Sequence, residues 1–253
     1  MNYIYINKSL IRFFHRYSKL NLRSSSALYL KKLKISVAVH GSLPKAGSVL
    51  LISNHQSMSD LFFLSAAFSR NDTYFLGSMI NQLLAGDWKR RLLPVFLSNH
   101  PVNHSHGRLR QWLWTHREGY ISRQEAMARN RQTVSRAARL LAKGKQILIF
   151  PTGHKLYYEQ HLWSKGVAHL LKESQESQTE KNRISVVYAH IERLPWLTQL
   201  RQYYPDALLR FLPEKSLSIR FSRPKVMSPK TITRLSPAEL TAFLKQGFER
   251  ELG

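Results

Sequence analysis

A short aliphatic run that ends in a polar string constrains the fold of this chain more than any other feature. Residues Val49–Ile52 are all aliphatic, residues 53–60 read Ser-Asn-His-Gln-Ser-Met-Ser-Asp, and Leu61–Leu64 is apolar again. The first run predicts a buried strand and the second predicts a helix. Functional side chains are common in such connections because a rigid scaffold holds them in place. We therefore expect His55 and Asp60 to emerge at the mouth of a cleft.

The residue types of this pair suit proton transfer. A histidine titrates near neutral pH, and a carboxylate one turn away can fix its tautomer and stabilise the imidazolium. With a hydroxyl as acceptor, the pair would form an acyl-transfer centre in which His55 is the general base and Asp60 orients it. The alternative is a core histidine near a helix-capping aspartate, and the spacing alone does not exclude it.

The polar string also carries a family resemblance. Asn54-His55-Gln56-Ser57 followed by Asp60 resembles the N-H-x-S-x-x-D signature of the 1-acylglycerol-3-phosphate acyltransferase family, and weaker similarity extends from about residue 35 to 191. The resemblance implies transfer of a fatty acyl group to the hydroxyl of a lysophospholipid or similar glycerolipid. It implies coenzyme A or acyl carrier protein thioesters as donors, with no cofactor and no metal ion.

A second block places an arginine in front of a predicted helix. In the family, a motif at the position of Gly119–Arg123 ends in an arginine that contacts the acceptor's phosphate, and Arg123 is the matching residue. A guanidinium beside a helix amino terminus can bind an anion through its own donors and the helix dipole. The alternative is a solvated surface arginine.

A third block departs from the family. Ile149–Lys155 resembles the family's F-P-E-G-T-R sequence, with Gly153 retained, Thr152 in place of the glutamate and Lys155 in place of the arginine. The resemblance implies that Thr152, Gly153 and Lys155 bind the acceptor. A threonine cannot pair with a cation, so we expect an acceptor that is bulkier or differently charged than glycerol phosphate.

The order of the predicted elements indicates an α/β fold. Strands alternate with helices, which predicts a mostly parallel central sheet flanked by helices. The predicted strands cover residues 35–40, 48–53, 73–76, 146–150, 183–191 and 217–221, and the predicted helices cover residues 61–68, 124–143 and 166–174, with a last helix that starts at 236.

The amino end, residues 1–34, is predicted to be a basic amphipathic helical region, followed by an acyltransferase domain at 35–253. Nine Lys or Arg residues and no acid precede Asp60. This composition favours two helices on an anionic membrane surface, the second capped by Ser24–Ser26. The alternative is packing on the protein's own core. One helical face carries Tyr3, Ile6, Leu10, Phe13, Tyr17 and Leu20.

The charge balance suggests an anionic partner. The chain has 39 Lys and Arg against 15 Asp and Glu, a formal net charge of +24, which suits anionic lipid or an acidic carrier protein; we expect no specific nucleic acid. No apolar run approaches the roughly 18 residues of a membrane span, and no signal-peptide core is evident. We therefore expect peripheral attachment to the cytoplasmic side of a membrane.

Two alternatives to the glycerolipid acyltransferase stay open. The missing glutamate could mark acylation of a non-glycerol acceptor such as an aminolipid. The same change is also compatible with a non-catalytic basic membrane- or nucleic-acid-binding protein on an acyltransferase scaffold. Dependence of acyl-thioester turnover on His55 would separate the enzymes from the binding protein. The histidine-rich residues 100–106 are predicted to form a surface loop, not a metal site.

Overall fold

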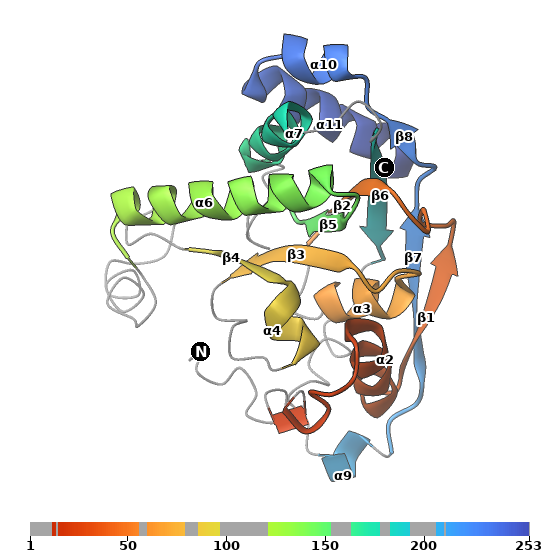
Figure 1. Ribbon diagram of the computed structural model, residues 1–253. Coiled ribbons are helices and arrows are strands. Elements are labelled where there is room, and N and C mark those ends of the chain that lie inside the picture. Colours follow the sequence, from red (N-terminus) through yellow and green to blue (C-terminus); the bar gives the residue numbers. More distant parts are fainter. Residues whose placement is uncertain are drawn as a thin grey trace, which may run out of the picture.

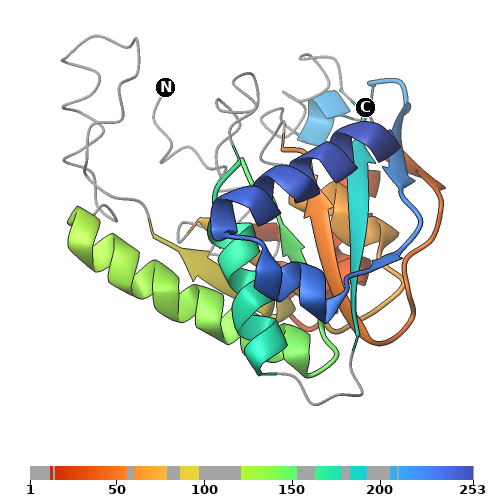
Figure 2. The ribbon, with the colours of Figure 1, turned by 90° about the horizontal axis from the view of Figure 1, so that it is seen from above.

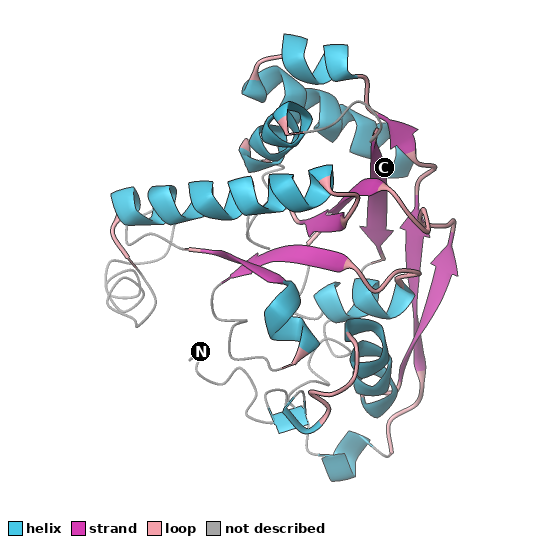
Figure 3. Cartoon of the chain, viewed as in Figure 1, coloured by secondary structure: helices cyan, strands magenta, loops and turns pink. Residues whose placement is uncertain are grey.

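The structure, a computed structural model, consists of one sheet with helices on both faces (Figures 1 and 3). It describes residues 12–13, 15–55, 60–78, 86–96, 121–152, 163–177, 183–192, 206–209 and 211–252. The strands are β1 (Ile35–His40), β2 (Ser48–Ser53), β3 (Thr73–Ser78), β4 (Leu92–Val95), β5 (Gln146–Ile149), β6 (Ile184–Ile191), β7 (Lys215–Phe221) and β8 (Lys225–Val226). The helices are α2 (Leu22–Lys32), α3 (Asp60–Ala67), α4 (Asp87–Arg91), α6 (Arg123–Ala142), α7 (Gly166–Glu176), α9 (Asp206–Leu209), α10 (Pro229–Arg234) and α11 (Pro237–Leu252).

Strand direction decides which chain segments meet at each edge of the sheet. The order is β1-β7-β6-β2-β5-β3-β4, with β8 added to β6. Strands β2 to β6 run parallel to one another, whereas β7 is antiparallel to β6 and parallel to β1. The carboxyl ends of β2, β5 and β6 therefore share an edge with the amino ends of β1 and β7. We call it the His55 edge, because His55 follows β2 there.

The aliphatic run that opened the sequence lies at the centre of the sheet. All four side chains of Val49–Ile52 have 0% exposure, and burial of each contributes about 1.5–3 kcal/mol. They alternate between two cores, because successive strand residues point to opposite faces. Leu51 joins the core under α2 and α3, and Leu50 and Ile52 join the core under α6, α7 and α11. The mostly parallel α/β sheet predicted from the sequence is confirmed.

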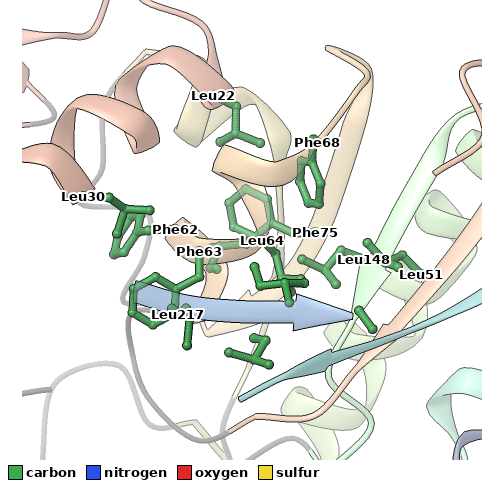
Figure 4. Close-up of a cluster of buried hydrophobic side chains, with 14 of the residues drawn as sticks. Leu22, Leu30, Leu51, Phe62, Phe63, Leu64, Phe68, Phe75, Leu148 and Leu217 are labelled. Atoms are coloured by element: carbon green, nitrogen blue, oxygen red, sulfur yellow. The ribbon is translucent and has the colours of Figure 1, made fainter. Parts of the chain in front are cut away.

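The core on the α3 side is rich in aromatic rings. Phe62 and Phe63 of α3 pack with Phe75 of β3 and with Leu51 and Leu148 of the two central strands (Figure 4). This packing holds α3, and with it Asp60 at the start of the helix, against the sheet.

Helix α2, in the predicted amino-terminal region, packs on this core as well. Tyr29 and Leu30 are each 2% exposed, the Leu22 N–H donates to the Asp87 carboxylate at 3.0 Å, and the indole of Trp88 donates to the hydroxyl of Ser25 at 2.9 Å. For this helix the alternative interpretation, packing on the protein's own core, is the one the structure has. Residues 1–11 lie outside the described residues.

The predicted cap of this helix was wrong. Asn21 is the N-cap, since its side chain accepts from the Ser24 N–H at 2.8 Å. Ser25 and Ser26 lie inside the helix, where their hydroxyls donate to backbone carbonyls one turn earlier. Serine competes for backbone partners in this way within helices as well as at caps, so the three serines gave a misleading boundary.

The carboxyl-terminal half follows its local signals closely. Helix α6 ends at Ala142 and the chain turns at Gly144, whose φ is +79°. At the start of α11, Glu239 accepts from the Ser236 N–H at 2.8 Å and Ser236 accepts from the Glu239 N–H at 3.3 Å. These two bonds form a capping box where the sequence predicts that the last helix starts. Among the described helices, none is both long and apolar enough to cross a bilayer.

Candidate active site

His55 and Asp60 lie together at the carboxyl end of β2. The imidazole Nδ1 is 2.9 Å from the Asp60 Oδ2, and the two side chains are 18% and 2% exposed. An ionised carboxylate only accepts hydrogen bonds, so Nδ1 carries the proton and Nε2 keeps a lone pair. A histidine held in this tautomer, with one side still open, can accept a proton from a bound hydroxyl.

A phenyl ring that follows the neighbouring strand of the sheet packs on the imidazole. Phe150 follows β5, which pairs with β2, and its ring centroid lies 4.6 Å from that of His55 at an interplanar angle of 32°. The phenyl ring also packs against the core on the α3 side. His55 is therefore held by a carboxylate at one ring nitrogen and by an aromatic ring against its face.

Asn54 anchors the strand end, a role that the sequence analysis missed. Its side-chain NH₂ donates to the Ile191 carbonyl at 2.9 Å, and its side-chain oxygen accepts from the Ile191 N–H at 2.8 Å. The last ladder pair between β2 and β6 is Ser53 with Ala189. Asn54 thus continues the attachment of β2 to β6 by a side chain, up to the residue before His55. The sequence signal for this role was an asparagine placed directly after the predicted buried strand and directly before the histidine.

Thr152 lies on the same edge, after β5. It is 8% exposed, and its hydroxyl oxygen has no hydrogen-bond partner within the described part of the chain. The chain returns to this point after the third block, where the Ser164 N–H donates to the Pro151 carbonyl at 2.7 Å. Gly153 and Lys155, the other two predicted acceptor-binding residues of the block, lie outside the described residues.

Arg123 is the first residue of α6 and is exposed. The amino-terminal part of the helix is attached just after β4, where the Asn130 amide exchanges hydrogen bonds of 2.8 and 3.0 Å with the Phe96 backbone. Strand β4 is three positions from β2, roughly 14 Å at the usual strand spacing, and Figure 2 shows the light-green α6 extending away from the sheet. These contacts do not bring Arg123 beside His55, and its phosphate contact stays a prediction.

No group of three His, Asp or Glu side chains among the described residues is arranged to hold a metal ion. The histidine-rich residues 100–106 lie outside that part of the chain. The site as described is therefore a histidine base, its carboxylate partner, an aromatic neighbour and a buried threonine. This set of groups can take a proton from a hydroxyl, which is what group transfer to an alcohol requires.

Comparison with known proteins assigns the family. The sequence model of the Acyltransferase family matches residues 36–191, more than half of the chain. This protein therefore belongs to the Acyltransferase family, and it is an acyltransferase, as the motif at His55 predicted.

Among solved structures, one similar chain is the 1-acyl-sn-glycerophosphate (LPA) acyltransferase PlsC from Thermotoga maritima. The two share 18% sequence identity with a TM-score of 0.48, over 94% of this chain and 85% of that chain. No curated protein matches this chain significantly.

Proposed function

We propose that this acyltransferase moves a fatty acyl group from an acyl thioester, of coenzyme A or acyl carrier protein, to the hydroxyl of a lysophospholipid or related glycerolipid. His55 is the general base and Asp60 its positioning partner. The observation that carries the proposal is the 2.9 Å contact between His55 Nδ1 and the buried Asp60 carboxylate, in a chain whose family transfers acyl groups.

The reaction needs one proton relay. The acceptor hydroxyl donates to His55 Nε2, and its oxygen attacks the thioester carbonyl carbon as the proton moves to the imidazole. The tetrahedral intermediate then collapses, the C–S bond breaks, and the imidazolium returns its proton to the thiolate. Asp60 stabilises the imidazolium between the two steps. The thioester is already activated, so no covalent enzyme intermediate is required.

Substitution of the pair tests this mechanism. We expect His55→Ala to abolish acyl transfer, and Asp60→Asn to lower kcat by orders of magnitude because the amide no longer fixes the reactive tautomer. His169, exposed on α7, provides a matched His→Ala control that should keep full activity. Wild-type turnover by purified, folded His55→Ala would show that the base is elsewhere.

The acceptor's polar end is proposed to bind at Thr152, Gly153, Lys155 and Arg123. A buried hydroxyl is normally hydrogen-bonded, and the Thr152 hydroxyl has no partner among the described residues. This supports a ligand group as its partner. The absence of the family's glutamate favours an acceptor other than glycerol phosphate, an aminolipid being one candidate.

Competition kinetics on a panel of lyso-lipids tests the acceptor. Thr152→Glu should shift preference toward lysophosphatidate, and Thr152→Val, which keeps the shape without the hydroxyl, should raise the acceptor's KM without changing the preference. Arg123→Ala and Lys155→Ala should each raise the acceptor's KM more than the donor's. If the wild type already prefers lysophosphatidate and Thr152→Glu changes nothing, the unusual acceptor is wrong and the chemistry at His55 is untouched.

The amino end is proposed to attach the enzyme peripherally to an anionic bilayer on the cytoplasmic side. Because Tyr29 and Leu30 belong to the core, a test by deletion of residues 1–34 would damage the fold. Arg12 and Arg16 are exposed, so Arg12→Gln and Arg16→Gln can be combined in the full chain. At about 1 kcal/mol for each charge near the surface, liposome sedimentation should fall by roughly 30-fold at low salt. An unchanged binding curve would place the attachment elsewhere.

A further inference from the structure

The most exposed large apolar side chain on the described surface is Phe211, at 84% exposure. Leu208, three residues earlier, is 46% exposed. Single exposed apolar residues are common on protein surfaces, but these two stand one turn apart and therefore face the same direction. They form a small apolar projection.

The chain on either side of this projection is anchored to the core. Leu209 is 3% exposed and belongs to the core on the α3 side, against which Leu212 also packs. Two backbone hydrogen bonds hold the turn: the Phe211 N–H donates to the Leu208 carbonyl at 3.2 Å, and the Leu212 N–H donates to the Leu209 carbonyl at 3.3 Å. Two leucines thus point inward while Leu208 and Phe211 point outward.

Lysines lie on the segment that follows the projection and on the segment paired with it. The Lys215 N–H donates to the Lys34 carbonyl at 3.0 Å, which joins the start of β7 to the end of α2, where Lys31 and Lys32 form the last turn. The described residues of segments 28–34 and 206–215 include four lysines, at 31, 32, 34 and 215, and two acids, Asp206 and Glu214. The two segments together carry a net positive charge.

The topology places this surface on the His55 edge. Strand β7 runs antiparallel to β6, so Lys215 at its start lies at the edge where β2 and β6 end. Figure 2 shows α9 on the side toward which β2 and β6 point. Strand β1, which follows Lys34, is three positions from β2, or roughly 14 Å across the sheet.

We propose that Leu208, Phe211 and the lysines at 31, 32, 34 and 215 form a second bilayer contact, in which Phe211 enters the interfacial region of an anionic membrane. An aromatic side chain flanked by lysines is the composition of a membrane interface. The contact deepens the proposed function, because a lipid acceptor held at this surface meets His55 at the same edge of the sheet. An acidic carrier protein is the competing occupant, and the test includes it.

The absence of cysteine from the chain permits a site-specific test in the full-length protein. Phe211→Cys is labelled with an environment-sensitive fluorophore, and Phe243→Cys, 45% exposed on α11, serves as the matched control. Vesicles of neutral phospholipid with an anionic component should shift the emission at 211 to the blue and leave the emission at 243 unchanged. No shift at 211, or equal shifts at both positions, would overturn the proposal. So would a shift at 211 produced by acyl carrier protein and not by vesicles.

Partition measurements with unlabelled variants complete the test. Phe211→Ala should lower partition to anionic vesicles by about tenfold or more, Lys215→Gln by about fivefold and only when anionic lipid is present, and Phe243→Ala not at all. Turnover of a water-soluble short-chain acceptor without vesicles should be unchanged in all three variants. Loss of that turnover in His55→Ala tests the proposed function separately, so a failed membrane contact and a failed mechanism give different results.

Discussion

Asn54 lends itself to a quantitative prediction, because both of its polar groups are used and its neighbour is the proposed base. The side chain is 4% exposed and makes two hydrogen bonds to Ile191, at 2.8 and 2.9 Å. Asn54→Ala would leave both the Ile191 N–H and the Ile191 carbonyl without this partner, and each buried polar group left in this way costs about 1–3 kcal/mol. We therefore expect Asn54→Ala to lower the free energy of unfolding by about 2–6 kcal/mol.

The same substitution should lower kcat, because β2 is no longer attached to β6 at the residue before His55. Misplacing a catalytic group by about 1 Å can cost about a hundredfold in rate. Asn130 offers a matched control, since its amide makes the same reciprocal pair of hydrogen bonds with the Phe96 backbone. This pair lies at the β4 flank of the sheet, away from His55. Asn130→Ala should lose stability and keep kcat per folded molecule.

Urea denaturation at constant m-value, combined with initial rates under conditions where each variant is folded, separates the two effects. Asn54→Asp provides a second test, because one carboxylate oxygen would face the Ile191 carbonyl, to which it cannot donate a hydrogen bond. This variant should be as unstable as Asn54→Ala at neutral pH and should recover when the carboxyl is protonated. If Asn54→Ala and Asn130→Ala had equal kcat, attachment at Asn54 would have no part in positioning His55.

Three further predictions concern stability. The Arg70 side chain is 4% exposed and donates to the Asp72 carboxylate and to the Gly47 and Gly144 carbonyls, each at 2.7 Å. Because Arg70→Ala removes the donor for all of these acceptors, it should lower the free energy of unfolding by about 3 kcal/mol; urea melts at neutral pH check this, and a fall below about 1 kcal/mol would contradict it. Burial, together with the neighbouring Arg220, lowers the pKa of His190 in the folded state. The neutral imidazole therefore favours the fold, and stability is lost as pH falls below about 6.5 and the unfolded state takes up a proton first. His190→Gln should make the free energy of unfolding depend less on pH in this range, and an unchanged pH profile would refute it. A Cβ at Gly247 would lie 2.3 Å from the Tyr188 hydroxyl oxygen, so Gly247→Ala should lower Tm, and Tyr188→Phe should partly restore it.

The sequence was most informative where a local pattern decides the structure. Four consecutive aliphatic residues at 49–52 predicted a buried strand, because only a central strand covered on both faces requires them. Ser236 and Glu239 predicted the start of α11 from a motif whose partners are three residues apart. The approach of His55 to Asp60 was predictable for the same reason, since they are only five positions apart in the sequence.

Features that depend on distant parts of the chain were not predictable in this way. The Asn54 attachment joins residues 137 positions apart, and nothing in the local sequence identifies Ile191 as its partner. Helix α2 has the basic composition of a membrane-surface helix, yet its Trp88 and Asp87 contacts are 63 and 65 positions away. The basic composition of the helix comes from its solvent-facing residues, whereas its packing depends on the few residues that face the core.

The position of Arg123 also depends on distant parts of the chain, and it bears on how the acceptor is bound. The residue before a helix was expected to reach a phosphate because the family places an arginine there. In this chain the amino-terminal part of α6 is attached at the β4 flank of the sheet through Asn130, and the strand count puts that flank roughly 14 Å from β2. The proposed lysines of α2 and β7 lie at the opposite flank of the same edge. An acceptor whose hydroxyl meets His55 therefore lies between two basic flanks. The two proposals give these flanks different roles: Arg123 would bind the acceptor's head group, and Lys34 would contact the bilayer. Kinetics with a water-soluble acceptor should distinguish the roles, since Arg123→Ala should raise the acceptor's KM and Lys34→Gln should not.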